Sequence, residues 1–438
     1  MIVAAALTLT TAACNKDAAT AGAGGQPGSV SLFGTDGIMS NSFGDTVKAS
    51  GELNGLSGTA ALNPPNPAFD HAILSQDPSL DDFSYAGQAY DAVMIVALAA
   101  QTAGSTDGVT IAKYIDGITE LRRGGVQCSS FTTCMDAVKA GKDIAYRGVT
   151  ITNGFTKAGE PSTASYGTLH FGSNNHIDSQ QTEFVNAGDQ SSAATQTLIP
   201  PAQPAFYNGP ALNIGELLPV TGPLASQGKP IIAGVNLAIQ EINKAGGVLN
   251  NRIATEFADD GTDVNKSVAG AKRLISQGAN AIIGPSFSGA STAVAPVAAR
   301  AGVVVMSPSA TASSLSTLKA DGMFFRTAPS DILQAQAIAD VITRSGAQRV
   351  FIVARSDDYG TPLAHDTAAA LTADGLDASD ITTAAYSAAT NANNSSTYTQ
   401  IATSVRSFRA DSVLLIGYEE IGGMISALSA AGLQFNAS

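Results

Sequence analysis

The sequence predicts an α/β fold in which helices cover both faces of mostly parallel sheets. Apolar segments such as VFIV at 350–353 and VLLI at 413–416 are unbroken, which indicates strands that are buried on both faces. These segments alternate with stretches of helical periodicity, as expected when helices connect parallel strands. In one such stretch, which ends at two glycines, the residues on a common helical face are Ile232, Val235, Leu237, Ala238 and Ile242.

The alternation is clearest in residues 210–438. After an opening strand from Leu212, the predicted strands are ATEFADD (254–260), ANAIIGP (279–285), VVVMSPSA (303–310), RVFIVARSDD (349–358) and DSVLLIGY (411–418). The helices predicted after the first are SVAGAKRLISQG (267–278), ASTAVAPVAARAG (290–302), ILQAQAIADVITRSG (332–346), TPLAHDTAAALTADG (361–375) and TYTQIATSVRSFR (397–409). Residues 30–178 form a second folded block with a weaker alternation and one strong helix at 85–104.

Three segments are predicted to lie outside these blocks. Residues 1–14, MIVAAALTLTTAAC, resemble the end of a bacterial lipoprotein signal, in which small residues precede an acylated cysteine, here Cys14. The alternative is an apolar terminus with an incidental cysteine. Residues 15–29 predict a flexible tether, and residues 179–209, polar and then proline-rich, predict a linker.

The other two cysteines, Cys128 and Cys134, lie six residues apart in a loop that enters a helix. We predict that they form a small disulfide ring in an oxidising compartment. A zinc site would need two more ligands, and the chain's four histidines are scattered singly. We therefore expect no metal site and no cofactor.

Composition and motifs argue against several classes of function. The net charge of −13 makes nucleic acid an improbable partner, because phosphate binding needs a basic surface. No apolar run approaches the ~18–20 residues that span a bilayer. GPLASQGKP at 222–230 has the wrong spacing for a phosphate-binding loop, and GPSFSG at 284–289 has misplaced glycines for a nucleophile elbow. Nothing in the sequence indicates an enzyme.

Small, hydroxyl-rich loops follow several of the predicted strands. They are GPSFSGAST, SPSAT, SDDYGT, GYEE and GTDG. Ligands of open α/β sheets bind at the carboxyl ends of the strands, so these loops predict a binding site. Ser288 and Thr311 lead into helices, whose free N–H groups favour an anion such as a carboxylate. Tyr359 and Tyr418 would supply apolar walls, and Asp36 a carboxylate for a cation.

These loops carry a resemblance to the type I periplasmic binding proteins of the branched-chain amino acid transport family. Residues 210–438 resemble the first two thirds of that family through TGPLASQGKPIIAGVNLAIQEINKAGG, IIGPSFSGAST, SPSAT, FFRTAPSDILQAQAIAD, DDYGTPLA and the GY loop. Residues 30–178 resemble its last third through LFGTDGI, AYDAVMIVALA, the cysteine loop and YRGVTITNGFTKAGEPSTASYGTLHFG. The resemblance implies two Rossmann-like lobes joined by three crossovers.

The order of the two blocks departs from the family, because the end precedes the beginning. We therefore predict a circular permutant, in which residues 179–209 bridge the old termini and the strand due after Ser438 is the one at 29–38. Lobe 1 would contain 210–329 and 63–147. Lobe 2 would contain the ranges 330–438, 30–62 and 148–178. A misjoined reading frame or a swapped dimer are the alternatives.

The resemblance also implies roles for individual residues in holding an amino acid. Ser288 and Thr311 would bind the α-carboxylate. The Ser309 carbonyl, beside Ala310, and Thr311 would bind the α-ammonium together with Asp36, and Tyr359 and Tyr418 would close over the side chain. Glu419 has no apolar role, so a strictly branched-chain specificity stays open; it is alternatively a solvated loop charge.

The function expected from this resemblance is that of an exported, lipid-anchored solute-binding protein that delivers an amino acid to the permease of an ABC importer. A ligand-sensing receptor module of the same fold is one alternative. A permuted relic that folds but binds nothing is another.

Overall fold

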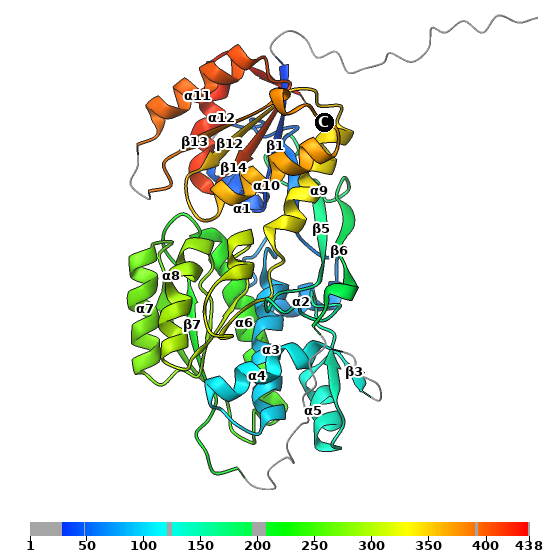
Figure 1. Ribbon diagram of the computed structural model, residues 1–438, viewed down its shortest axis with the longest axis vertical. Coiled ribbons are helices and arrows are strands. Elements are labelled where there is room, and N and C mark those ends of the chain that lie inside the picture. Colours follow the sequence, from blue (N-terminus) through cyan, green and yellow to red (C-terminus); the bar gives the residue numbers. More distant parts are fainter. Residues whose placement is uncertain (1–28, 48, 121–124, 195–206, 390–392, 437–438) are drawn as a thin grey trace, which may run out of the picture.

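The computed structural model describes residues 29–47, 49–120, 125–194, 207–389 and 393–436. The chain forms two α/β lobes stacked along the long axis of the molecule (Figure 1). Lobe 1, the lower one in Figure 1, is built on a fully parallel sheet, and lobe 2 on a larger sheet that is parallel except at one edge. The predicted α/β class with mostly parallel sheets is therefore confirmed.

Lobe 1 contains a sheet in the order β11-β10-β9-β7-β8. Its strands are β7 (Asn213–Leu218), β8 (Ala254–Asp259), β9 (Ala281–Ile283), β10 (Val304–Ser307) and β11 (Phe324–Arg326), with a separate pair β3 (Val126–Cys128) and β4 (Ile144–Tyr146). Its helices are α2 (Pro67–Leu74), α3 (Ala86–Ala103), α4 (Gly108–Thr119), α5 (Phe131–Lys139), α6 (Ala225–Lys244), α7 (Val264–Ser276), α8 (Ser288–Arg300) and the 3₁₀ helix η2 (Ser313–Thr317). Most strands of this lobe come from the second half of the chain, whereas α2 to α5 come from the first.

Lobe 2 contains the strand order β13-β12-β14-β1-β2-β5-β6, and β15 also pairs with β1. The strands are β1 (Ser29–Gly34), β2 (Ser57–Ala61), β5 (Thr163–His170), β6 (Glu183–Gly188), β12 (Val350–Arg355), β13 (Ile381–Tyr386), β14 (Ser412–Ile416) and β15 (Gln434–Phe435). The helices are α1 (Asn41–Thr46), α9 (Asp331–Arg344), α10 (Gly360–Ala373), α11 (Ser395–Phe408) and α12 (Gly422–Ala430). Short 3₁₀ turns are η1 (Gln190–Ser192), η3 (Ala378–Asp380) and η4 (Glu419–Ile421).

Strand β1 joins the two ends of the chain within one sheet. It runs parallel to β14 on one side, with Phe33 opposite Leu414, and parallel to β2 on the other, with Phe33 opposite Ser57. At its start Ser29 and Val30 also pair with β15. Figure 1 shows β1, in blue, among the orange and red strands of the C-terminal part. A strand in this position is buried on both faces, which explains its apolar sequence.

Helix α3 is the central helix of lobe 1. All of its residues are buried, and it packs against α6, α4 and the strands β9 and β10. Burial on every side explains why its sequence is apolar all round rather than amphipathic. Among the described residues no single helix is long and apolar enough to span a membrane, although α3 and α4 together pass that test with a bend of 110° between them.

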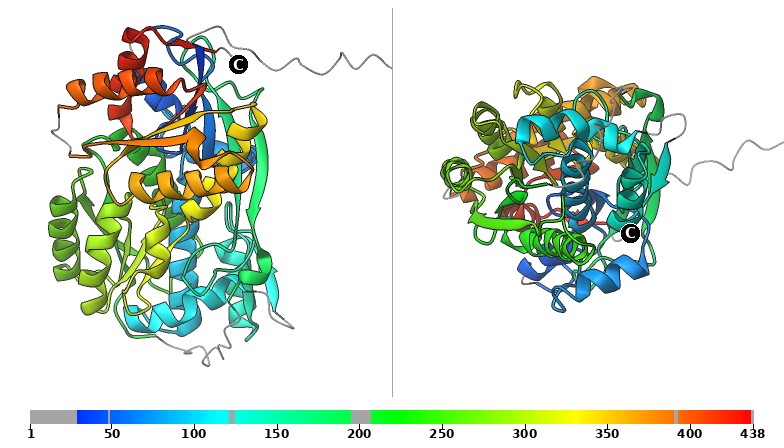
Figure 2. Two further views of the ribbon diagram at one scale, coloured as in Figure 1. Left: turned by 45° about the horizontal axis from the view of Figure 1, so that its top comes forward. Right: turned by 90° about the horizontal axis from the view of Figure 1, so that it is seen from below.

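Part of the segment 179–209, for which a linker was predicted, is a strand. Residues Glu183–Gly188 form β6, which pairs antiparallel with β5 at the edge of the lobe 2 sheet. Both strands lie along one side of the molecule beside the junction of the lobes (Figures 1 and 2). Because β6 is exposed on both faces, it lacks the alternation of apolar residues by which a strand is predicted.

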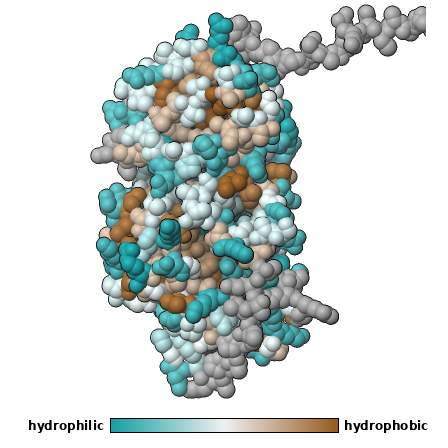
Figure 3. All heavy atoms as spheres, viewed as in Figure 1, coloured by the Kyte–Doolittle hydropathy of each residue, from teal (hydrophilic) through white to brown (hydrophobic). Residues whose placement is uncertain are grey.

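In the described part of the chain, three passages cross between the lobes. Residues 62–66 leave β2 for α2, residues 147–162 leave β4 for β5, and residues 327–330 leave β11 for α9. Because these passages join the lobes through the backbone, they are the elements through which the lobes could turn against each other. On the face seen in Figure 3, small groups of hydrophobic side chains are scattered among hydrophilic ones over both lobes.

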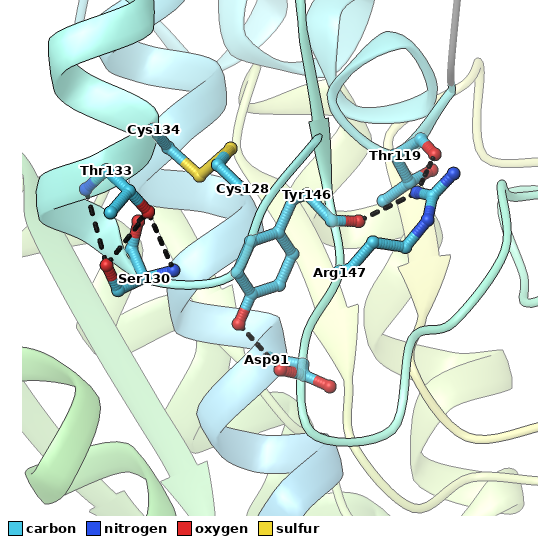
Figure 4. Close-up of a disulfide and its surroundings, with 8 residues drawn as sticks. All are labelled: Asp91, Thr119, Cys128, Ser130, Thr133, Cys134, Tyr146 and Arg147. Carbon is cyan, nitrogen blue, oxygen red and sulfur yellow. Dashed lines mark hydrogen bonds between the residues drawn. A yellow bond between two sulfur atoms is a disulfide. The ribbon is translucent and has the colours of Figure 1, made fainter. Parts of the chain in front are cut away.

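The predicted disulfide between Cys128 and Cys134 is confirmed, with an S–S distance of 2.09 Å (Figure 4). It ties β3 to α5 at the far end of lobe 1. Helix α5 begins with a capping box, in which the Ser130 hydroxyl accepts from the N–H of Thr133 and the Thr133 hydroxyl accepts from the N–H of Ser130. The disulfide and the capping box therefore hold the same turn, between Cys128 and Cys134.

Asp91 holds the second crossing passage against α3. Its carboxylate accepts hydrogen bonds from the Tyr146 hydroxyl (2.8 Å, Figure 4), from the N–H groups of Val149, Thr150 and Ile151, and from the Thr150 hydroxyl. A Cβ atom at Gly148 would lie 2.1 Å from the Asp91 carboxylate, so the chain can pass this close only as glycine. Burial raises the pKa of Asp91 even though these hydrogen bonds lower it.

We expect Asp91→Ala to lower the free energy of unfolding by at least about 3 kcal/mol, because it leaves several buried donors without an acceptor. Urea denaturation would measure this loss. Thr150→Val is the graded control, since it removes one hydroxyl and should cost only about 1 kcal/mol. A change below 1 kcal/mol in Asp91→Ala would show that the passage is not held by this carboxylate.

The burial of Glu216 leads us to expect that the free energy of unfolding depends on pH. It lies on β7 with 6% of its surface exposed, and burial raises its pKa to about 7 from the ordinary 4.5. The folded protein therefore binds a proton more tightly than the unfolded chain does. Its contribution is fully present below pH 4.5 and is lost as pH rises through about 7, by about 3 kcal/mol in total.

Glu216→Gln should remove this part of the pH dependence, so that the variant gains stability relative to the parent as pH rises from 4.5 to 8. Chemical denaturation at several pH values would measure it. Glu256→Gln, on the neighbouring strand β8 and half-buried, is the matched control and should leave the slope unchanged. Parallel pH profiles for the parent and Glu216→Gln would contradict the assignment.

Candidate functional site

The loops at the carboxyl ends of strands from both lobes meet at their junction. Phe33 of β1, with Tyr359 after β12 and Tyr418 after β14, packs in one apolar cluster with Leu224 and Phe287 of lobe 1. We call the group formed by Asp36, Tyr359, Tyr418, Ser288 and Thr311 the interlobe site. The position agrees with the general rule that ligands of α/β sheets bind at this edge.

Asp36 is the buried acid of this site. The Tyr359 hydroxyl donates to its Oδ1 at 2.7 Å and the Tyr85 hydroxyl donates to its Oδ2 at 2.6 Å. Tyr359 belongs to lobe 2, whereas Tyr85 precedes α3 in lobe 1, so the carboxyl group is held from both lobes. Burial raises the pKa of Asp36, while the two tyrosine hydrogen bonds lower it. A carboxyl group that is costly to bury as an anion favours a cationic partner.

Tyr359 and Tyr418 stack on each other, with ring centroids 5.3 Å apart and planes 17° from parallel. On Tyr418 lies the guanidinium group of Arg355, 3.9 Å from the ring centroid. Arg355 is itself bound to Asp357 at 2.6 Å and to Glu420 at 2.7 Å. These contacts form a row that begins with the cation Arg355, continues through the rings of Tyr418 and Tyr359, and ends at the acid Asp36.

The loops of lobe 1 present buried hydroxyl groups. Ser288 is the first residue of α8, and its hydroxyl accepts a hydrogen bond from the N–H of Ala312 at 3.2 Å. The Ser309 hydroxyl donates to the carbonyl of Ser286 at 2.8 Å, so the two loops are tied together. Helix α8 has no side-chain cap, and the buried hydroxyl of Ser286 has no partner among the described residues. Uncapped N–H groups with free hydroxyls suit a carboxylate.

Arg326 of β11 supports the loop that contains Ala310 and Thr311. It is fully buried, and its Nη1 donates to the carbonyl oxygens of Ala310 at 3.2 Å and Ala312 at 3.0 Å. Its Nε donates to Glu160 of the second crossing passage at 2.9 Å. Because this buried ion pair is also hydrogen-bonded to the backbone, it fixes the position of the loop that contains Ala310. Thr311, unlike Ser288, leads only into the 3₁₀ helix η2 rather than an α-helix.

A second buried acid, Asp331, lies at the start of α9. It is fully buried, and both of its carboxyl oxygens lack a hydrogen-bond partner among the described residues, although the Thr311 hydroxyl is close by. Burial and the neighbouring carboxyl group of Asp36 raise the pKa of Asp331 well above its ordinary value. Two buried carboxyl groups this close to each other favour a cationic partner.

Several hydrogen bonds join the lobes directly across the site. The Ser226 hydroxyl donates to Glu419 at 2.5 Å, the Gln227 amide donates to the carbonyl of Asp36 at 3.3 Å, and the Ser313 hydroxyl donates to Asp366 at 2.7 Å. Glu419 is thus half-buried against the opposite lobe rather than a solvated loop charge. The lobes are closed on each other in this structure.

The sequence did not reveal Tyr85, Asp331 and Arg355 as parts of this site. Tyr85 precedes a helix in the left-handed conformation, with φ at 59°, and no sequence signal marks a non-glycine residue there. Asp331 has the usual position of an acid in the first turn of a helix, which the helix dipole alone explains. No cluster of three or more metal-binding side chains occurs in the described part of the chain. Cys14 lies outside the described residues.

Buried polar groups between two lobes can meet a ligand only when the lobes part, which defines the class: a two-lobed ligand-binding protein. The family profile described as periplasmic binding protein matches residues 211–437, half of the chain. The chain belongs to this family of periplasmic binding proteins.

Two curated relatives have similar sequences over about half of the chain. The Leu/Ile/Val-binding protein BraC3 of Rhizobium johnstonii is 32% identical over 216 residues, which are 49% of this chain and 57% of the relative. The Leu/Ile/Val-binding protein homolog 3 of Brucella melitensis is 29% identical over 225 residues, which are 51% and 59%. The chain therefore spans less than two thirds of the length of either relative.

Among solved structures, the branched-chain amino acid transporter substrate binding protein LivJ of Streptococcus pneumoniae, in complex with isoleucine, is 24% identical. The match covers 52% of this chain and 63% of that one, with a TM-score of 0.44. An ABC transporter substrate-binding protein of Desulfitobacterium hafniense, in complex with Leu, is 26% identical over 52% and 65%, with a TM-score of 0.42.

Proposed function

We propose that the protein binds an amino acid between its two lobes and delivers it to an ABC importer. The observation that carries this proposal is the pair of buried acids Asp36 and Asp331, which lie beside loops suited to a carboxylate. An α-amino acid offers one positive and one negative group at short separation. The names of the relatives in Rhizobium and Brucella support the same class of ligand.

In this proposal each charged group of the ligand meets its complement. The ammonium group binds Asp36 and Asp331, together with the Ser309 carbonyl and the Thr311 hydroxyl. The carboxylate binds Ser288, Thr311 and the free N–H groups at the start of α8. The side chain lies against Tyr359 and Tyr418. The Ser286 hydroxyl, which has no partner among the described residues, completes the polar shell.

The two acids also explain why closure would depend on ligand. Closing the lobes without a cation buries two carboxyl groups near each other, which is unfavourable unless one takes up a proton. An ammonium group between them removes that penalty. The differential stabilisation of the closed form by the ligand is the condition for ligand-driven closure.

The selectivity for the side chain is set, we infer, by the aromatic stack and by Glu419. Glu419 directly follows Tyr418 and accepts from Ser226 of the opposite lobe in the closed form, so a ligand side chain that reached past the aromatic stack would meet this carboxylate. The aromatic stack suits an apolar side chain, whereas the carboxylate of Glu419 suits a polar or cationic one. Both branched-chain amino acids and related amino acids with a polar end are therefore candidate ligands.

The order of segments supports a circular permutation relative to the family. The family profile covers only 211–437, and residues 29–194 supply β1, β2, β5 and β6 of lobe 2 and α2 to α5 of lobe 1. We propose that these residues are the last third of the family fold, transferred to the front. An acylated Cys14 would then anchor the protein to a membrane close to the permease.

A thermal-shift panel of amino acids, amides and urea on the full chain tests the function. We expect stabilisation by one class of amino acid, growing with concentration as linkage requires. Stabilisation by none of the twenty amino acids would contradict the proposal and favour a non-binding relic. Transport assays in vesicles with a candidate permease would separate an importer component from a ligand-sensing receptor module.

A further inference from the structure

A cavity of about 330 Å³ lies at the junction of the lobes, and none of the residues that define the interlobe site lines it. It is bordered by two of the three crossing passages, at residues 62–66 and at Val149 and Thr150. We call it the hinge pocket and define it by Leu62, Phe69, Asp82, Thr182 and Phe184 together with these passages. A volume of this size is typical of a small-molecule site.

The walls of the hinge pocket are mostly apolar and come from both lobes. Phe69 of α2 and Phe83 belong to lobe 1, while Leu169 of β5, Ile177 and Phe184 of β6 belong to lobe 2. Phe184 is 36% exposed. An exposed phenylalanine beside an apolar cavity indicates surface that a ligand could cover.

The charged residues that line the hinge pocket are all acidic. Asp70, Asp81 and Asp82 line it, and no lysine, arginine or histidine is among the residues that line it. Asp82 is the most buried of the three: it accepts a hydrogen bond from the N–H of Ser84 at 3.1 Å, and burial raises its pKa. The charge of the pocket thus has no counterion within its walls.

We propose that the hinge pocket is a second binding site, for a small amphipathic cation such as an aromatic or alkyl amine. Its apolar body would lie against Phe69, Phe83 and Phe184, where it gains contact area and cation–π attraction. Its ammonium group would face Asp82 and Asp81, which supply the missing charge complement. A neutral ligand would leave these acids unpaired, and an anion would be repelled.

Occupation of this pocket is coupled to the angle between the lobes, because its walls belong to both lobes and to two crossing passages. An occupant that fits the present geometry favours the closed arrangement. By thermodynamic reciprocity, a ligand in the interlobe site and a cation in the hinge pocket then strengthen each other's binding.

The test measures binding of 2-phenylethylamine to the full chain by calorimetry, with 2-phenylethanol and phenylacetate as the neutral and anionic probes of similar shape. We expect 2-phenylethylamine to bind at least fivefold more tightly than either. Asp82→Asn should reduce its affinity at least fivefold, and Thr182→Trp, which fills the pocket from a half-buried position, should abolish binding. Asp374→Asn, an exposed acid on lobe 2, is the matched charge control and should change nothing.

Asp36→Asn separates the two sites, since an amine bound in the interlobe site would lose affinity in this variant while one in the hinge pocket would not. Circular dichroism melts check that each variant is folded. A second charge-neutral variant, Asp81→Asn, keeps the test open if Asp82→Asn does not fold. Equal binding of the three probes, or binding that is lost in Asp36→Asn and kept in Thr182→Trp, would overturn the proposal.

Discussion

Asp36→Ala is expected to lower the affinity for the bound amino acid at least tenfold, which corresponds to about 1.4 kcal/mol. The variant strips the ammonium group of one of its two buried carboxylates and leaves the hydroxyls of Tyr85 and Tyr359 without their acceptor. Both losses fall on the closed, ligand-bound form. Calorimetric titration with the amino acid that gives the largest thermal shift would measure the change.

The isosteric variant Asp36→Asn separates charge from hydrogen bonding, because it keeps one oxygen for a tyrosine hydroxyl and removes the negative charge. We expect it to lie between the parent and Asp36→Ala. Asp374→Asn, an exposed acid of the same lobe, serves as the control for overall charge. An affinity that is unchanged in Asp36→Ala would remove this residue from the ligand site.

Residues 210–438 produced alone are expected to show no cooperative unfolding transition. The fragment lacks β1, which lies between β14 and β2, and α3, the buried central helix of lobe 1. The lost burial of Val30, Leu32 and Phe33 alone costs about 1.5–3 kcal/mol per side chain, whereas the net stability of a domain is only about 5–15 kcal/mol. Thermal melts followed by circular dichroism would show the difference from the full chain.

Mixing this fragment with residues 29–194 should restore a cooperative melt if the two parts assemble as they do in the intact chain. Residues 29–194 produced alone are the second control, since they lack all five strands of the lobe 1 sheet and half of the strands of the lobe 2 sheet. A sharp, cooperative melt of 210–438 by itself would show that the lobes do not depend on the N-terminal strands and helices.

The sequence was informative where local pattern and burial agree. The unbroken apolar runs of β12 and β14 and the helical stripe of α6 report burial directly, because a residue enclosed on all sides must be apolar whatever its partners are. The loops with Asp36, Tyr359 and Tyr418 follow such strands, so their meeting at one sheet edge follows from parallel topology.

The sequence was uninformative where a residue's environment comes from distant parts of the chain. Strand β6 was predicted as linker, because an exposed edge strand needs no apolar pattern. Asp331 looks like an ordinary helix start and Tyr85 like an ordinary core residue, until the fold places Asp331 beside Asp36 within lobe 2 and brings Tyr85 to it from lobe 1. Glu216 and Asp82 show no sign in the sequence that they are buried.

The amino-acid sequence by itself therefore determined the fold class, the positions of most elements and the strand-end loops, since these depend on residue type and spacing along the chain. Only the tertiary structure decided which acids share one enclosure, how β1 joins β14, and where a cavity forms beside the crossing passages. Those features depend on the packing of segments hundreds of residues apart, and the free energy of a buried charge is set by its neighbours in space.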